Sequence, residues 1–598
     1  MAFPGNGREM EVAIFGGGLA GLTAAHELLR AGARVTLYEA DAQLGGHAKS
    51  GWAGGAPSEV SWRGYGPFYA NTFEVMRAIP RPEGGTVYDN LSLPIRFLHL
   101  RDRSRGRARP RPRPTLLDNA RGAFRIAQAM AADERPFDET SYLETISPGL
   151  SQDGRDAYIH AVGPYTGQDI GQTTMHHMAK FARLQGSGAY PHYHPPASVG
   201  EIEKPGYLHR SRVAPWHLMN LPTSMAWFDP WAAHLEALGG LLVLGAALLR
   251  VEAAGGLVTE CWVEVDGEER AVRADAYVLA LDPYGAAALI ARSPSLPRGG
   301  GTQFDRLVEI AAKPPHVQIG FQMTFAEGGG VPLPPLVGLA FPDSEFNLTA
   351  FPLEQFYPRG LTKGRRVWSG TACIGDRPGG LFGLPARALT EAQFRAEVVH
   401  QVSRSPELGL AAEDIAEVRP WEDWTFPLEE GGAVTSRRPK WVNGPGERLP
   451  AQETELSNLV LAGAHTATAT GFYSMEAAVE SGKRAAALLA PQAAIPLVEH
   501  EPAPLIKALS QADNHLYRAG LPSVIPCALG ALGVLVIVLV LLLAWGVARA
   551  VGGKSRSGAP PAQGAQILQN RASRGRARAA PPQIAGPLAA RAASRPRE

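Results

Sequence analysis

The sequence is poor in cysteine, carries almost no net charge, and lacks an apolar run at its start. Its 598 residues include three cysteines, Cys261, Cys373 and Cys527, which lie far apart in the chain. This scarcity excludes a disulfide framework and any zinc site built on closely paired cysteines. The 58 Lys and Arg residues nearly match the 57 Asp and Glu residues, which leaves a formal net charge of +1. A dedicated nucleic-acid binder usually carries a strongly basic domain, so that class is excluded as well.

The first residues, MAFPGNGREMEVAIFGGG, contain no stretch suited to a secretory signal. Such a signal needs an apolar run of about 7–15 residues, and an organelle transit peptide needs an Arg-rich amphipathic one. We therefore expect the folded part of the chain to lie on the cytosolic side of any membrane it meets.

The C-terminal region is different, because 22 residues from Cys527 to Ala548 contain no charge. At about 1.5 Å per residue, a helix of this length spans a hydrocarbon core of roughly 30 Å. The run predicts a single transmembrane helix over 526–548, followed by a disordered basic tail over 549–598. The sequence does not decide on which side of the membrane the tail lies. Its arginines favour the cytosol, but the N-terminal part also has no signal that would carry it out of the cytosol.

A shorter amphipathic pattern precedes this run. Leu505, Ile506, Leu509 and Leu516 fall on one face of a helix predicted over 503–519. It is either an interfacial helix leading into the anchor or an ordinary helix packed on the folded domain.

The strongest pattern stands at the start of the folded sequence. A buried, β-branched run over 11–15 leads into the glycine-rich stretch 16–21, and helical spacing then continues to Gly32. A second strand is predicted over 34–38, and it ends at Glu39. The order strand, GxGxxG, helix, strand, acid predicts a dinucleotide-binding βαβ unit.

Each residue of this unit has a physical task. Gly16 permits the tight turn, Gly18 lets the backbone approach a pyrophosphate, and Gly21 allows the helix to pack closely on the strand. Leu19 and Ala20 begin the helix, whose N-terminal amides carry a partial positive charge toward the phosphates. We expect Glu39 to accept hydrogen bonds from an adenosine ribose.

The residues after this unit, Ala40 and then Gly45, Gly46 and His47, form a Gly-Gly-His turn. Here the chain resembles the superfamily of FAD-dependent amine oxidases and phytoene desaturases. In that superfamily the amides of a Gly-Gly-Arg/His turn reach the pyrophosphate of FAD. The resemblance therefore implies FAD as the cofactor, with His47 where an arginine is commoner.

The resemblance returns in NLVLAGAHTATATGFYSMEAAVESGKRA, residues 458–485, which is similar to the closing motif of the superfamily. It implies that Gly463, Ala464, Ser474 and Met475 lie at the flavin, where a helix N-terminus faces the atoms that gain negative charge. Ala464 departs from the family pattern, which has an acidic residue there. Loss of a hydrogen bond to a charged group costs about 1.5–3 kcal/mol, so FAD binding is weakened unless the next residue, His465, compensates.

The middle of the chain extends the resemblance. The stretch 241–281 reads as three or four strands, in which the resemblance places Val251 against the adenine. The stretch PTSMAWFDPWAAHLEALGG, 222–240, resembles the branch of phytoene desaturases and hydroxysqualene dehydroxylases. In all, the resemblance covers roughly residues 10–490.

The implied fold class is α/β: a Rossmann-like FAD-binding domain assembled from three chain segments, an inserted α+β substrate domain, and a C-terminal transmembrane helix. The expected segments are FAD-domain parts at 10–79, 222–285 and 451–492, a helical insertion at 80–221, a strand-rich insertion at 286–450, the amphipathic helix at 503–519, the membrane helix at 526–548 and the tail at 549–598.

Two chemistries follow from the resemblance. Amine oxidases of the superfamily carry a Lys on a substrate-domain strand and an aromatic residue just before the Met of the closing motif. Gln318 and Ser474 stand at these positions here, with Phe472 and Tyr473 displaced. We therefore expect a membrane-anchored, FAD-dependent desaturase or dehydrogenase that transfers hydride at flavin N5 from a hydrophobic isoprenoid or lipid substrate.

Its partners are the substrate and the lipid bilayer, with no nucleic acid, and its location is a membrane that it crosses once. An amine oxidase is the first alternative. A degenerate flavoprotein scaffold, suggested by Ala464, is the second. Tyr473 and His465 are candidates for polar groups near the flavin, and the sequence identifies no catalytic acid or base.

Two other polar clusters give weaker indications of a function. His176, His177, His192 and His194 have no carboxylate or cysteine at ligand spacing, so we expect no metal site. Seven arginines fall between residues 101 and 113, and Pro and Gly prevent a helix there. The loop 101–114 is therefore expected to be a solvated insertion rather than a membrane or nucleic-acid contact.

Overall fold

The computed structural model describes residues 9–59, 61, 63–66, 68–93, 95–100, 114–158, 171–185, 216–329, 332–429, 431–500, 502–528 and 542. The chain divides into two units, 1–529 and 530–598, and every helix and strand named below lies in the first.

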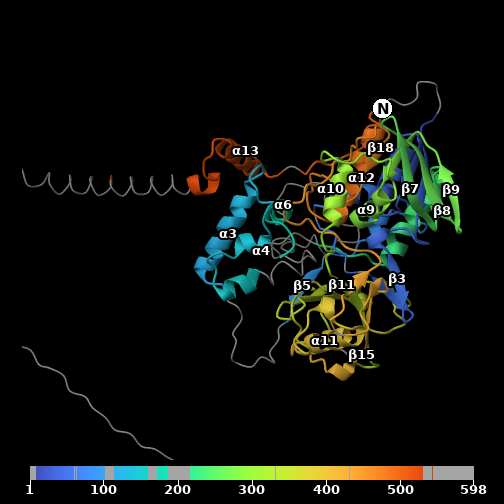
Figure 1. Ribbon diagram of the computed structural model, residues 1–598. Coiled ribbons are helices and arrows are strands. Elements are labelled where there is room, and N and C mark those ends of the chain that lie inside the picture. The colour runs from blue at the N-terminus through green and yellow to red at the C-terminus, as the bar shows by residue number, and fades with distance from the viewer. Residues whose placement is uncertain are drawn as a thin grey trace, which may run out of the picture. The chain divides into compact units, whose positions relative to one another are not determined.

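The first unit contains a five-stranded parallel sheet, whose strand β18 is labelled at the upper right of Figure 1. Its strand order is β18 (Leu459–Leu461), β10 (Ala276–Leu279), β1 (Glu11–Phe15), β2 (Arg34–Glu39), β6 (Leu241–Leu244). The central strands are continuous apolar runs, which is typical of parallel strands buried on both faces. Strands from three distant stretches of sequence therefore share one sheet.

The two faces of this sheet are covered differently. Val12 and Ile14 point to the side of α1 (Leu19–Arg30) and α12 (Met475–Leu489), which pack on each other. Ala13 and Phe15 point to the other side, toward a three-stranded antiparallel sheet. That sheet consists of β7 (Ala246–Ala254), β8 (Leu257–Val265) and β9 (Glu268–Val272). The stretch 241–281 thus holds five strands, one or two more than its pattern predicts.

A second, six-stranded sheet builds the body that Figure 1 draws in olive and yellow around α11. Its order is β15 (Ile415–Pro420), β11 (Ile319–Phe325), β14 (Val367–Ala372), β13 (Leu348–Pro352), β12 (Val337–Phe341), β5 (Arg96–His99). The helix α11 (Glu391–Ser403) packs on it at β15. The strand-rich character of 286–450 agrees with the sequence. However, β5 comes from the segment expected to be helical, and it pairs with β12 in parallel.

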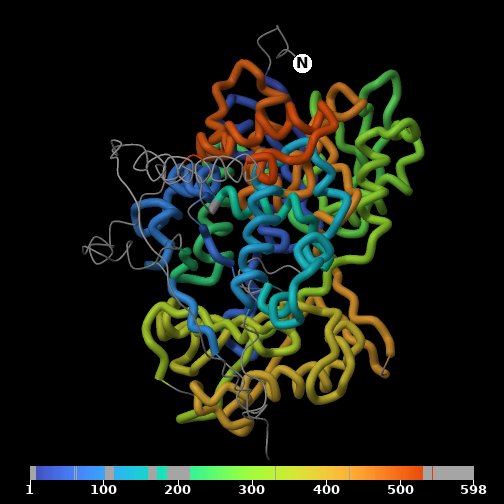
Figure 2. Tube along the Cα trace, turned by 90° about the vertical axis from the view of Figure 1, so that its left-hand side faces the viewer, coloured from blue at the N-terminus to red at the C-terminus, as the bar shows by residue number. Residues whose placement is uncertain are grey.

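A helical lobe holds α3 (Leu116–Met130), α4 (Tyr142–Ile146) and α6 (Met175–Gln185). The helix α13 (Pro504–Arg518) lies against this lobe, above the cyan segments in Figure 2. Asp513 of α13 accepts a hydrogen bond from Arg135 at 2.6 Å, and Ser510 accepts one from Arg183 at 3.2 Å. Polar side chains therefore dock this helix, while Leu505 of its apolar face is 71% exposed.

The remaining helices and strands cover the sheets or join them. They are η1 (Gly46–Ala48), β3 (Ser50–Ala53), β4 (Ala56–Glu59), α2 (Ala70–Ala78), η2 (Val87–Asn90), η5 (Ser224–Phe228), α8 (Asp229–Ala237), α9 (Pro283–Ala291), α10 (Gln303–Ala311), η6 (Leu353–Gln355), η7 (Ala386–Ala388), η8 (Ala412–Asp414), β16 (Trp424–Thr425) and β17 (Thr435–Ser436).

Several predicted segments lie outside the described residues: nearly all of the loop 101–114, the histidines 192 and 194, most of 526–548, and the tail 549–598. Within the part of the chain that the structure describes, no helix is long and apolar enough to cross a membrane. The domain boundaries and the membrane helix drawn from the sequence therefore stay predictions.

Candidate cofactor and substrate site

A cavity of 440 Å³ opens at the carboxyl edge of the parallel sheet. Gly16 follows β1, Glu39 ends β2, Asp282 follows β10 and Gly463 follows β18, and all four line the cavity. Open α/β sheets bind ligands at this edge. The cavity is therefore the first candidate for both the cofactor and the substrate.

The glycine-rich loop closes one end of the cavity. Gly16 has φ +109°, a conformation that side chains rarely adopt, and a Cβ at Gly21 would collide with the carbonyl oxygen of Gly16. Gly21 itself does not line the cavity, because it packs α1 onto the sheet as the sequence predicts. The turn and the helix start therefore need glycine at both positions.

The Gly-Gly-His turn lies directly beside this loop. The amide of Gly45 donates to the carbonyl oxygen of Gly17 at 2.8 Å, and a Cβ at Gly46 would lie 3.2 Å from the Cα of Gly18. His47 lines the cavity next to them, and burial lowers its pKa. Its Nε2 lies 3.1 Å from the carbonyl oxygen of Arg438. Two glycine-rich loops thus bring backbone groups together at the cavity, which suits a pyrophosphate.

Glu39 has the geometry that a ribose needs. Its carboxylate accepts hydrogen bonds from the amides of Gly17 at 2.6 Å and Asp41 at 2.9 Å. Burial raises its pKa, although these two amides oppose the shift. A carboxylate has about four acceptor positions, so two remain for hydroxyl groups.

The N-terminus of α12 borders the cavity at Ser474 and Met475. Ser474 caps the helix by accepting the amide of Ala477 at 3.1 Å. The partial positive charge of the helix start therefore faces the cavity.

Glu476 turns away from this cavity. It accepts the amides of Asn71 and Thr72 at 2.9 Å each, and lies 2.8 Å from His500. These contacts cap α2, so Glu476 joins the start of α12 to the start of α2.

Ala464 also lines the cavity, next to Gly463 and His465. Burial lowers the pKa of His465 to about 4, so its imidazole is neutral at pH 7. His465 therefore does not replace the negative charge that the family pattern has at Ala464.

The other three carboxylates in the described lining already hold donors of the protein. Asp41 binds Lys49 at 3.3 Å and also Arg438. Asp282 accepts two amides at the start of α9, at 2.9 and 3.0 Å. Asp423 accepts the indole N–H of Trp421 at 2.9 Å and two arginines. These contacts help to hold the loops around the cavity.

Four aromatic side chains also line the cavity. We call Tyr69, Phe181, Trp216 and Phe472 the aromatic wall. The rings of Phe181 and Phe472 lie 5.2 Å apart, edge to face, and the rings of Tyr69 and Trp216 lie 6.4 Å apart. This arrangement offers a large apolar surface with little freedom to move.

Lys440 and Gln318 meet in the lining of the cavity. The Lys440 amine donates to the Gln318 amide oxygen and lies 5.5 Å from the centre of the Tyr473 ring. The Tyr473 ring in turn packs against Trp441 at 5.8 Å. Burial lowers the pKa of Lys440 to about 8. All four side chains line the cavity.

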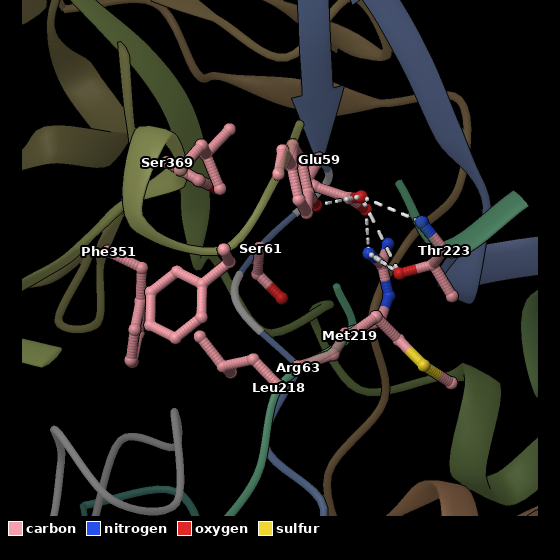
Figure 3. Close-up of a pocket in the computed structure, with 11 residues that line it drawn as sticks. Glu59, Ser61, Arg63, Leu218, Met219, Thr223, Phe351 and Ser369 are labelled. Atoms are coloured by element: carbon pink, nitrogen blue, oxygen red, sulfur yellow. Dashed lines mark hydrogen bonds and ion pairs between the residues drawn. The ribbon is translucent and has the colours of Figure 1, made fainter. Parts of the chain in front are cut away.

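A second, much smaller cavity of 30 Å³ adjoins Ser61 and Arg63, which also line the first (Figure 3). Figure 3 shows Glu59, Arg63 and Thr223 joined on one side, and Phe351 and Leu218 on the other. Glu59 accepts from Tyr357 at 3.1 Å and from the amide of Thr223 at 3.1 Å. The space suits a water molecule or two rather than a substrate.

The structure brings nearly all the predicted cofactor residues to the cavity. Its lining includes Gly16, Gly18, Leu19, Ala20, Glu39, Ala40, Gly45, Gly46, His47, Gly463, Ala464, Ser474 and Met475. Val251 is not among them: it is fully buried in β7, its amide donates to Ser293 at 2.9 Å, and its carbonyl accepts from Ser295 at 3.1 Å. The predicted contact of its backbone with the adenine therefore gains no support.

Sequence reasoning missed Asp282, Lys440 and Arg438 as site residues, and it missed Tyr69, Phe181 and Trp216 of the aromatic wall. Asp282 had a usable signal, since an Asp-Pro pair directly follows a buried strand. His176 and His177 are taken up by contacts within the lobe and with Tyr473: Asp138 lies 3.2 Å from His176, and the Tyr473 amide donates to His177 at 3.2 Å. Among the described residues, no group of His, Cys, Asp or Glu could hold a metal.

Fold and cavity together define an α/β oxidoreductase of the dinucleotide-binding type. Two family models match the chain: an NAD(P)-binding Rossmann-like domain over residues 14–79, and a flavin-containing amine oxidoreductase over residues 218–490. The chain belongs to the superfamily of FAD-dependent amine oxidases, and it is an FAD-dependent oxidoreductase.

Solved structures share the fold at low identity. Wild-type putrescine oxidase bound to putrescine is 15% identical, with a TM-score of 0.52, over 81% of this chain and 99% of that one. A cofactor-binding redesign of putrescine oxidase is 16% identical, with a TM-score of 0.53 over the same shares. Cyclohexylamine oxidase from Brevibacterium oxydans is 15% identical, with a TM-score of 0.49, over 81% and 99%. A search of curated proteins finds no match. The nearer resemblance to the phytoene desaturase branch stays a prediction.

The residues present fit FAD. The loops at 16–21 and 45–47 would hold the pyrophosphate, Glu39 the ribose, and the start of α12 the flavin. Family membership argues against the scaffold alternative. The effect of Ala464 on the affinity for FAD can be measured directly.

Proposed function

We propose that the chain oxidises a hydrophobic isoprenoid or lipid substrate as a desaturase or dehydrogenase. FAD, when bound, supplies the acceptor for a hydride from a carbon atom of the substrate. The protein's own residues bind the substrate, orient it and exclude water from it.

The observation that carries this proposal is the aromatic wall. Tyr69, Phe181, Trp216 and Phe472 come from four separate segments, and all four line the cavity. Burial of apolar surface contributes about 25 cal/mol per Å², so such a wall favours an apolar molecule over a small polar one.

The proposal includes a membrane anchor over 526–548, in keeping with an apolar substrate that dissolves in the bilayer. The uncharged run in the sequence supports it. The exposed Leu505 at the start of α13 adds an apolar side chain shortly before that run.

A flavin-containing amine oxidase is the second candidate, and one observation favours it. The rings of Trp441 and Tyr473 lie 5.8 Å apart at an interplanar angle of 72° and line the cavity. Such a pair could accept an amine between or over its faces.

Anaerobic reduction of the bound flavin separates the two candidates. The full chain, purified in detergent with FAD, would be mixed with geraniol, with longer isoprenoids and fatty acyl compounds, and with geranylamine as the matched amine. Bleaching of the flavin absorbance by isoprenoid or lipid compounds is expected. Bleaching by the amine alone would replace the first candidate with the second.

A further inference from the structure

Asp282 lies where the parallel sheet opens into the cavity. The residues that directly follow β10, 280–283, all line the cavity. In the sheet, β10 lies between β1, which leads to the glycine loop, and β18, which leads to Ala464. A Cβ at Gly16 would collide with the carbonyl oxygen of Ala280, so the loop after β10 closely approaches the glycine loop. Asp282 is therefore placed between the glycine loop and the loop that holds Ala464.

Asp282 is also the counterpart of Ala464 on the neighbouring strand. Leu279 of β10 pairs with Leu461 of β18 in parallel register, and the amide of Ala462 donates to the Leu279 carbonyl oxygen at 2.9 Å. Asp282 and Ala464 follow this pair at the same number of residues, and both line the cavity. A carboxylate thus lies on the strand beside the one where the family pattern has an acid.

The two oxygens of the Asp282 side chain have different surroundings. Oδ1 accepts the amides of Tyr284 and Gly285, at 2.9 and 3.0 Å, and in this way caps α9. Among the described residues, these are the hydrogen bonds that the carboxylate accepts. A carboxylate has about four acceptor positions on its two oxygens, so Oδ2 can accept hydrogen bonds from a ligand in the cavity.

Two other side chains of the cavity lining are close enough to feel the charge of Asp282. Burial lowers the pKa of His47, and the Asp282 carboxylate opposes that shift. Burial raises the pKa of Tyr473, and the same carboxylate adds to that shift. His47 belongs to the turn that would hold the pyrophosphate, and Tyr473 directly precedes Ser474, the cap of α12, which would face the flavin. Asp282 is therefore near both parts of the cofactor site.

From this placement we propose that Asp282 is a cofactor-binding residue, which accepts a hydrogen bond from a hydroxyl group on the carbon chain that joins the flavin ring of FAD to its pyrophosphate. A carboxylate accepts hydrogen bonds from hydroxyl groups and repels phosphate, so it suits this chain and not the pyrophosphate itself. Asp282 thus supplies part of the affinity that alanine at position 464 leaves out. The inference concerns the cofactor and is independent of the substrate's identity.

The test is a fluorescence titration of the apoprotein, prepared from the full chain, with FAD. Asp282→Asn keeps an oxygen that can cap α9 but removes the charge. It should raise the dissociation constant of FAD about tenfold, as the loss of one hydrogen bond to a charged group implies. Asp282→Ser should give a similar loss, because its hydroxyl can cap α9 but no second oxygen remains.

ADP distinguishes a lost contact with the joining chain from a general disturbance of the site. It has the adenine, ribose and pyrophosphate of FAD but neither the flavin nor the joining chain. Its affinity, measured by calorimetry, should be unchanged in both Asp282 variants. The control Asp305→Asn changes an acid at the start of α10, outside the described lining, and should leave the affinities for FAD and ADP unchanged.

A second substitution tests the link to position 464. Ala464→Asp, made in the Asp282→Asn chain, returns a carboxylate on the neighbouring strand, and FAD affinity should rise back to near that of the wild type. No recovery would overturn the statement that the two positions serve the same part of the cofactor.

Two results would overturn the assignment of Asp282 itself. One is an FAD affinity in Asp282→Asn equal to that of the wild type. The other is a loss shared equally by FAD and ADP, because the residue would then act only through the fold of the surrounding loops. Urea unfolding of the apoproteins shows whether the cap of α9 survives, and the ratio of the FAD and ADP affinities decides the matter even for a variant that unfolds earlier.

Discussion

Two parts of the cavity lining are built in opposite ways. The part assigned to the cofactor, here the cofactor end, consists of short loops at 16–20 and 45–47 that are rich in glycine and in backbone amides. The part that we propose for the substrate, here the substrate end, consists of side chains from distant segments, among them Tyr69, Phe181 and Lys440. A cofactor that many proteins share is bound by backbone groups, whereas substrate choice depends on individual side chains that can change without disturbing the fold.

This contrast predicts that each end can be damaged without the other. The largest effect is expected from Gly21→Val. A Cβ there collides with the Gly16 carbonyl oxygen, and the glycine loop and the start of α1 must then move. We expect loss of bound FAD and destabilisation by several kcal/mol. The measurements are the FAD content and a urea unfolding curve, with Gly360→Ala as control, because nothing lies within 4 Å of a Cβ at that position.

Phe472→Ala should damage the substrate end alone. Truncation of this buried ring costs about 3–5 kcal/mol and opens the aromatic wall at Phe181. FAD should stay bound at wild-type stoichiometry, while affinity for farnesol, an apolar isoprenoid alcohol, should fall about tenfold or more. The control is Phe346→Ala, which removes a fully buried ring from the core of the six-stranded sheet. It should lose as much stability as Phe472→Ala does and leave farnesol binding unchanged. Equal farnesol affinities in the two variants would contradict the assignment of the wall.

Ala464→Asp should strengthen FAD binding at the cofactor end. The new carboxylate would lie in the cavity wall next to the buried His465, where the family pattern has an acid. A charged-group hydrogen bond of about 1.5 kcal/mol would tighten FAD about tenfold. Fluorescence titration of apoprotein with FAD measures this change. Weaker binding than in the wild type would show that the departure at Ala464 is compensated elsewhere.

The smallest effect concerns the support of α12, the helix that borders both ends. Burial opposes the shifts, but the contact between Glu476 and His500 raises the pKa of His500 above 6.5 and lowers that of Glu476 below 4.5. The pair therefore stabilises the fold most between about pH 4.5 and 6.5. That contribution is lost as pH rises through the raised pKa of His500, or falls through the lowered pKa of Glu476.

His500→Gln should thus destabilise the protein by about 1 kcal/mol near pH 6, and by less at pH 9. Urea unfolding at several pH values measures the difference, with the exposed His515→Gln as control. A destabilisation that grows toward pH 9 would contradict the stabilising role of the protonated imidazole.

The same contrast explains how far the sequence could be interpreted. The parallel strands, the glycine loop and Glu39 follow one another in the chain, so local pattern predicts them. The hairpin at Asp266 and Gly267 was predictable too, because an Asp-Gly pair is typical of a two-residue turn in which both residues adopt positive φ. Both residues do so here.

The substrate end could not be predicted in this way. Phe181 and Trp216 look like ordinary core residues in the sequence, and only the tertiary fold shows that a cavity touches them. The parallel pairing of β5 with β12 joins residues about 240 positions apart, as in Leu98 with Leu339, and no periodicity reports such a contact. Lys440 was hidden for the same reason, since its partner Gln318 lies on another element.

The most direct test of the account is a titration of the FAD-loaded full chain with farnesol, recording the flavin spectrum and the FAD that remains bound. The account predicts a saturable spectral change with FAD still bound, because cofactor and substrate occupy different ends of one cavity. An unchanged spectrum, or release of FAD in proportion to added farnesol, would contradict it.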